Sequence, residues 1–136
     1  MKEIFYPVVA LVALTFAVGV RMYLVRSGAA RGRRVKIGDF RLGESANVPA
    51  DVALPNRNFM NLLETPLLFY VACVILFVTG GVDRIALTLA WLYVGLRVAH
   101  SLVHLTYNNV IHRLGAFGAS LVVLLLLWVR VVAALI

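Results

Sequence analysis

Two sets of polar side chains recur at helical spacing inside otherwise apolar stretches of the chain. The first set is Arg57, Asn61 and Glu64, which fall within about 60° of one another on a helix that turns about 100° per residue. The second set follows further along the chain at spacings of three, four and four residues, and contains Arg97, His100, His104 and Asn108. Each set therefore forms one polar face of its helix, and we expect the two faces to lie against each other or at a subunit boundary.

The residue types in these faces suit a small, multiply charged anion that also carries an amine. Arginine grips a carboxylate through paired hydrogen bonds, and Glu64 can accept an ammonium group or hold an arginine. The amide of Asn61 both donates and accepts, so it can bridge the two kinds of group. Two further cations, Arg21 and Arg113, stand at the end of the first apolar stretch and at the beginning of the fourth.

Simpler interpretations of the charged residues stay open. Charge at membrane depth costs about 2.5–3.5 kcal/mol per residue on insertion scales, so Glu64 could pair with Arg97 or Arg57 only to make the bundle insertable. Arg21, Arg57 and Arg113 could equally be anchors that extend their charges to the membrane interface.

The histidines have two alternative roles. His100 and His104 lie four residues apart, so they could bind a metal ion or haem on one helix face. A histidine pair without a carboxylate partner is a weak metal signal, and they could instead be hydrogen-bonded core residues. We therefore predict no metal site. The single cysteine, Cys73, lies in an apolar run and is expected to serve packing.

Composition predicts that the bilayer surrounds most of this chain. It has 136 residues, enough for one domain covering 1–136, and it is 62% hydrophobic and only 14% charged. A membrane-spanning helix needs about 20 apolar residues. The first stretch is longer than the apolar region of a signal peptide, has only Lys2 before it as a basic residue, and is followed by no convincing A-x-A cleavage site. We predict an all-α membrane protein whose four transmembrane helices run over about 4–24, 59–78, 84 to beyond 104, and 114–136. The residues at 79–83 predict a tight break, and those at 107–109 mark the polar end of the third span.

The basic residues predict an orientation for this bundle. Six of the 13 basic residues lie in a polar loop at about 25–56, and Arg113 lies in the other connection on the same side. Because cytoplasmic loops carry the excess of lysine and arginine, we expect both basic loops in the cytoplasm and both termini on the opposite side. The charge is thereby explained without nucleic acid.

These segments resemble the MAPEG family, the membrane-associated proteins in eicosanoid and glutathione metabolism. The stretch Arg57-x-x-x-Asn61-x-x-Glu64-x-Pro66 looks like the signature at the start of the family's second helix. Residues 97–105 are similar to the third helix of the microsomal prostaglandin E synthase branch, and the loop at 35–39 is like that of bacterial members. Arg113 matches the position of that branch's catalytic arginine, and Arg21 matches a glutathione-contacting arginine.

The resemblance implies a homotrimer of four-helix protomers that binds glutathione between subunits. Arg113 would stabilise the ionised thiol, and the other site residues would be Arg21, Arg57, Asn61, Glu64, His100 and His104. The implied function is a glutathione-dependent transferase or peroxidase that acts on lipophilic electrophiles arriving from the membrane lipids. His104 stands where the family commonly has a tyrosine, so prostaglandin synthesis is not implied. The alternative function is a non-catalytic binding or scaffold protein of the same fold.

Overall fold

The computed structural model describes residues 1–136 and contains no β-strand. Its four long helices are α1 (Phe5–Arg31), α2 (Ala50–Val78), α3 (Arg84–Leu105) and α4 (Val110–Leu135). Two short 3₁₀ helices, η1 (Lys2–Ile4) and η2 (Ile37–Phe40), precede α1 and lie in the loop after it. Each long helix is long and apolar enough to cross a membrane. The predicted all-α, four-helix membrane fold is confirmed.

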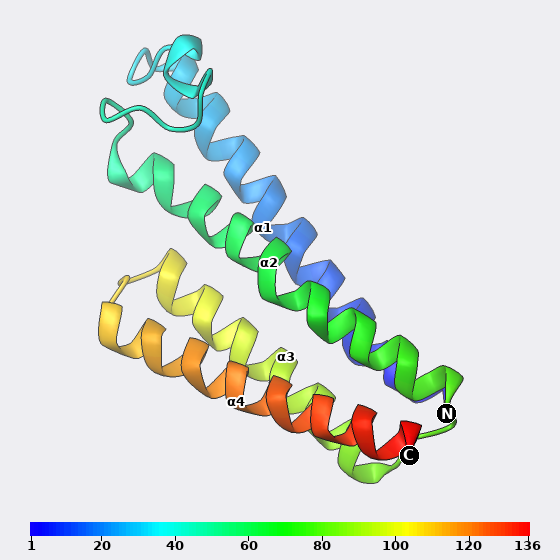
Figure 1. Ribbon diagram of the computed structural model, residues 1–136. Helices are drawn as coiled ribbons and strands as arrows, with labels where there is room; N and C mark the ends of the chain where they lie inside the picture. Colours follow the sequence, from blue (N-terminus) through cyan, green and yellow to red (C-terminus); the bar gives the residue numbers. More distant parts are fainter.

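The helices form two hairpins, in which α1 packs along α2 and α3 packs along α4 (Figure 1). Successive helices run antiparallel, so both chain termini lie at one end of the bundle. The connection from α1 to α2 and the turn from α3 to α4 lie at the opposite end, called here the loop end.

The helices differ from the predicted spans in where they begin and end. Helix α1 continues to Arg31 rather than ending near 24, and α2 already begins at Ala50 rather than near 59. The predicted loop at 25–56 is therefore helical at both ends, and the true connection is 32–49. Helix α4 also starts earlier than expected, at Val110. The predicted breaks at 79–83 and 107–109 are confirmed.

Helix α1 ends in a Schellman motif that places an arginine in an unusual conformation. The N–H of Arg34 donates to the Ala29 carbonyl at 2.9 Å, and the N–H of Arg33 donates to the Ala30 carbonyl at 3.1 Å. In this motif the residue after the C-cap has a left-handed backbone. Here that residue is Arg33, with φ of 55°. Glycine is the usual residue there, because a side chain costs about 1–2 kcal/mol in this conformation.

The connection at 32–49 is held in place by its own polar contacts. The Asp39 carboxylate accepts the N–H of Lys36 at 2.8 Å and the hydroxyl of Ser45 at 3.1 Å. The backbone hydrogen bond from Lys36 lowers the pKa of Asp39, so this carboxylate is ionised at neutral pH. Ion pairs tie the connection to the helices, from Arg26 to Glu44 at 2.8 Å and from Arg34 to Asp51 at 2.9 Å.

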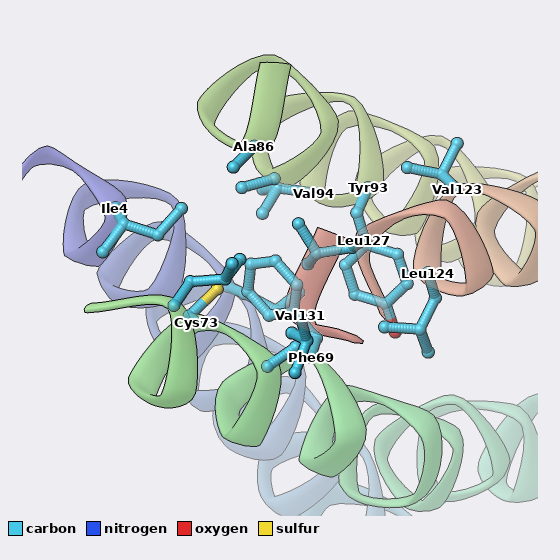
Figure 2. Packing of buried hydrophobic residues seen from close by; sticks show 14 of the residues in the cluster. Ile4, Phe69, Cys73, Ala86, Tyr93, Val94, Val123, Leu124, Leu127 and Val131 are labelled. Atoms are coloured by element: carbon cyan, nitrogen blue, oxygen red, sulfur yellow. The ribbon is translucent and has the colours of Figure 1, made fainter. Parts of the chain in front are cut away.

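The apolar core fills the half of the bundle nearer the chain termini. Phe69 of α2 stacks on Tyr93 of α3 with 4.7 Å between ring centroids. Figure 2 shows Cys73 of α2 beside these rings, together with Val131 of α4. Cys73 is fully buried, as expected for a packing role. The core thus joins the two hairpins away from the loop end.

Gly81, in the turn from α2 to α3, provides a test of this close packing. A Cβ at this position would lie 2.6 Å from the Cβ of Ala134 in α4 and 3.2 Å from Leu76 Cδ2. We expect Gly81→Ala to lower the free energy of unfolding by about 1–3 kcal/mol, the usual cost of overpacking. Thermal unfolding of the detergent-purified protein measures the change. Gly28→Ala is the matched control, because its Cβ would meet nothing within 4 Å, and it should cause no loss.

Candidate functional site

Polar side chains gather between α2, α3 and α4 at the loop end of the bundle. Helix α3 turns the same face inward along its whole length, so the positions that are apolar near the termini become polar toward the loop end. On α2, Asn58 and Asn61 form hydrogen bonds with this polar part of α3. The buried polar residues of this cluster are Asn58, Arg97, His100, Ser101 and His104.

Arg97 is the centre of the cluster and is 0% exposed. Its Nη2 donates to both oxygens of Asn61, the backbone carbonyl at 2.8 Å and the side-chain Oδ1 at 2.6 Å. Its guanidinium carbon lies 5.5 Å from the centroid of the Phe117 ring. The three ion pairs of the chain all lie elsewhere, and Nε and Nη1 of Arg97 have no hydrogen-bond partner. Arg97 is therefore a buried cation with unused donors.

The two histidines continue this polar face toward α4. His100 Nδ1 donates to the carbonyl oxygen of Arg113 at 3.1 Å, which leaves its Nε2 without a partner. The ring of His104 lies edge-on to that of His100 with 5.7 Å between centroids, and neither of its nitrogens has a partner. No group of three or more potential metal-binding side chains comes together here.

Arg113 is positioned by the turn between α3 and α4. Its Nη1 donates to Asn108 Oδ1 at 2.8 Å, and Asn108 holds left-handed backbone with φ of 46°. Asn109 caps α4 by accepting the N–H groups of Ile111 at 2.9 Å and His112 at 3.1 Å. The cap fixes the first turn of α4, and the Asn108 amide fixes the guanidinium that projects from that turn.

These groups surround a cavity of about 160 Å³. The cavity lies at the beginning of α4, where the helix dipole adds positive potential to the guanidinium of Arg113. Arg97 adds a second cation behind Asn61 and Phe117. Such a place attracts an anionic group. The residues that line the cavity are Asn61, His100, Val110, Arg113, Leu114 and Phe117.

Four of the predicted site residues, Arg21, Arg57, Glu64 and His104, do not line this cavity. Arg21, Arg57 and Glu64 are exposed on the surface of the single chain, and none of them forms an ion pair. The hypothesis that Glu64 pairs with Arg97 or Arg57 is therefore wrong for the single chain. The structure brings together Asn61, His100 and Arg113 around the cavity, with His104 against His100.

Other residues of the cluster were not among the predicted site residues. Asn58 accepts a hydrogen bond from the Ser101 hydroxyl at 3.2 Å, and both residues are buried. Asn58 could have been found from its spacing, because it shares the inward face of α2 with Leu62 and Phe69. Arg97 belonged to the predicted polar face but had no assigned place in the site. Phe117 gave no signal, since an aromatic residue in an apolar span is ordinary.

The fold and the cluster define a class, an integral multi-pass membrane protein with an electropositive polar site at one end of a four-helix bundle. The model of the MAPEG family matches residues 4–133, nearly the whole chain, and the chain belongs to that family. It is thus a membrane protein of the family of eicosanoid and glutathione metabolism. Comparison with curated proteins and with solved structures gives no significant match.

The contact between Asn61 and Arg97 can be tested by its effect on stability. Asn61→Ala removes one acceptor of a buried guanidinium, and we expect it to lower the free energy of unfolding by about 1.5–3 kcal/mol. Asn61→Asp retains an oxygen at the same position, so its loss should be smaller. Denaturation of both variants in detergent measures the difference. Equal losses in the two variants would show that the acceptor is unimportant.

Proposed function

We propose that the protein is a glutathione-dependent transferase or peroxidase that acts on lipophilic electrophiles. The observation that carries this proposal is the cavity where Asn61, His100 and Arg113 meet at the beginning of α4. Its donors and positive potential suit carboxylates and an ionised thiol. Membership of a family named for glutathione metabolism supports the choice of this thiol.

The residues present fit glutathione by the chemistry of their donors. One N–H group of the Arg113 guanidinium donates to Asn108 Oδ1, so the other donors of this guanidinium are free for an anion. His100 Nε2 and both nitrogens of His104 are unpaired, although burial normally requires partners. Asn61 presents an amide at the cavity wall. In this proposal these four residues bind the polar groups of the tripeptide.

The site of one chain is incomplete, which supports an oligomer, and the oligomer that the family resemblance implies is a homotrimer. A cavity of about 160 Å³ is smaller than the roughly 300–1,000 Å³ of ordinary small-molecule sites. Arg21, Arg57 and Glu64 are exposed, although an uncompensated charge facing lipid costs about 2.5–3.5 kcal/mol at the centre of a span. A neighbouring subunit would shield these three residues and add them to the cavity. We propose that the complete site lies at this subunit boundary.

Arg113 is the proposed catalytic residue. When bound, glutathione supplies a thiolate nucleophile that attacks or reduces the lipophilic electrophile. The positive charge of Arg113, held by Asn108, stabilises negative charge on sulfur at the cavity. The apolar residues that line the same cavity, Val110, Leu114 and Phe117, limit the access of water and favour an apolar partner.

A second apolar hollow supports access from the membrane. It has a volume of about 670 Å³, lies between α1 and α2, and is lined by Phe16, Phe59 and Leu63 among others. In the proposed orientation the loop end of the bundle lies in the cytoplasm, because it carries the basic connection at 32–49. Glutathione then enters from the cytoplasm and the electrophile from the lipid.

Binding of glutathione to the detergent-purified protein is the first test. Calorimetry should show saturable binding, which Arg113→Ala and Glu64→Gln should weaken by at least about tenfold, the effect of one lost charged hydrogen bond. Arg84→Gln is the matched control, because Arg84 is an exposed cation at the opposite end of the bundle. Absence of binding at millimolar glutathione would reject this ligand and favour a non-catalytic scaffold of the same fold.

The role of Arg113 can be separated from the integrity of its turn. Asn108→Gly accepts the left-handed backbone but removes the amide that holds Arg113. We expect kcat for conjugation of glutathione to a lipophilic electrophile to fall about tenfold, corresponding to about 1.4 kcal/mol, while thermal stability is retained. Arg113→Ala should lose more. Full activity of Arg113→Ala would reject the catalytic role of this residue.

A further inference from the structure

The connection between α1 and α2 presents cations and apolar side chains together. Ile37 is 87% exposed and Leu42 is 98% exposed, although both are large and apolar. Between and beside them Arg33, Lys36 and Arg41 are exposed and form no ion pair. Residues 33–42 are called the basic segment below. Its acidic residue, Asp39, is occupied by hydrogen bonds within the segment and from Ser45.

The basic segment is held in place by contacts with the rest of the chain, although these side chains are exposed. Asp39 closes the turn around η2, and Val35 is buried against Ala29 of α1 and Val52 of α2. The ion pairs from Arg26 to Glu44 and from Arg34 to Asp51 anchor the connection on both sides. The fold therefore holds the basic segment in one place with its cations and its apolar side chains outward.

The backbone of Arg33 is a second, independent observation. This residue occupies the left-handed position at the end of α1, where glycine would be free of strain. Its side chain makes no hydrogen bond or ion pair that would offset that strain within the fold. A strained cation without a contact in its own chain points to a contact outside it.

The place of the segment in the fold identifies the chemistry of its partner. It joins two membrane-spanning helices at the loop end, so it lies at the level of the bilayer surface (Figure 1). Cations beside exposed aliphatic side chains are the composition of segments that bind the interface of anionic membranes. We propose that the basic segment docks on the surface of anionic phospholipids. Arg33, Lys36 and Arg41 bind the headgroups, and Ile37 and Leu42 enter the boundary between headgroups and acyl chains.

This docking is independent of the proposed glutathione chemistry and concerns the same end of the bundle. It would fix the connection against the membrane next to the entrance of the cytoplasmic ligand. Each lysine or arginine near an anionic surface strengthens binding about fivefold, so three cations contribute about 100-fold.

The test places an environment-sensitive fluorophore on the full chain in lipid nanodiscs. Nitrobenzoxadiazole is attached at Leu42→Cys in a Cys73→Ala background, and discs of phosphatidylcholine are compared with discs that also contain phosphatidylglycerol. We expect blue-shifted emission in the anionic discs, quenching by lipids with a nitroxide near the headgroup, and reversal by salt. Replacing Arg33, Lys36 and Arg41 by glutamine should weaken this docking about 100-fold.

Two controls make the outcome decisive. A label at Ala46→Cys, an exposed position in the same connection but outside the basic segment, should keep the emission of a solvated probe in both lipids. Arg84→Gln removes a cation at the other end and should change nothing. Solvent-like emission at position 42 in anionic discs would overturn the proposal. Blue-shifted emission that is equal in both lipids and insensitive to nitroxide lipids would also overturn it, by showing contact with another subunit.

Discussion

The buried guanidinium of Arg97 is the constraint on which the loop end of this protein depends. A cation removed from water needs acceptors, and the chain provides only the two oxygens of Asn61. This contact holds α2 and α3 in a fixed register where the core no longer joins them. The remaining guanidinium donors stay unpaired beside Phe117. The same residue therefore locks the helices and supplies the positive potential of the cavity.

The bundle separates apolar packing from polar contacts along its length. Near the termini the helices meet through apolar contacts such as the stack of Phe69 on Tyr93. Near the loop end they meet through hydrogen bonds, and several buried nitrogens of Arg97, His100 and His104 have no hydrogen-bond partner. A buried polar group without a hydrogen bond raises the free energy of the folded state, so the apolar packing near the termini must offset this cost. A site with open donors is possible because the rest of the bundle does not depend on it.

Hydropathy and turn residues were sufficient to predict the four spans and both short turns, because lipid and core require the same apolar side chains. For the same reason, hydropathy does not show which face of each helix points into the bundle and which faces lipid. Periodicity placed Arg57, Asn61 and Glu64 on one face, yet only Asn61 turns toward Arg97 while Glu64 faces outward. The polar ends of α1 and α2 were also missed, since they are helical through tertiary packing of Ala29 and Val52 rather than through hydropathy.

The distribution of polar residues also bears on how the chain enters the membrane during synthesis. Helix α3 carries Arg97 and both buried histidines and is the least apolar of the four spans, whereas α4, which follows after a short turn, is the most apolar. A helix of this kind partitions poorly alone, so α3 is expected to leave the translocon together with α4 as a hairpin. Its arginine reaches Asn61 only when that hairpin meets the first one. Insertion of the half of the bundle that carries the polar cluster is thus coupled to the completion of the whole chain.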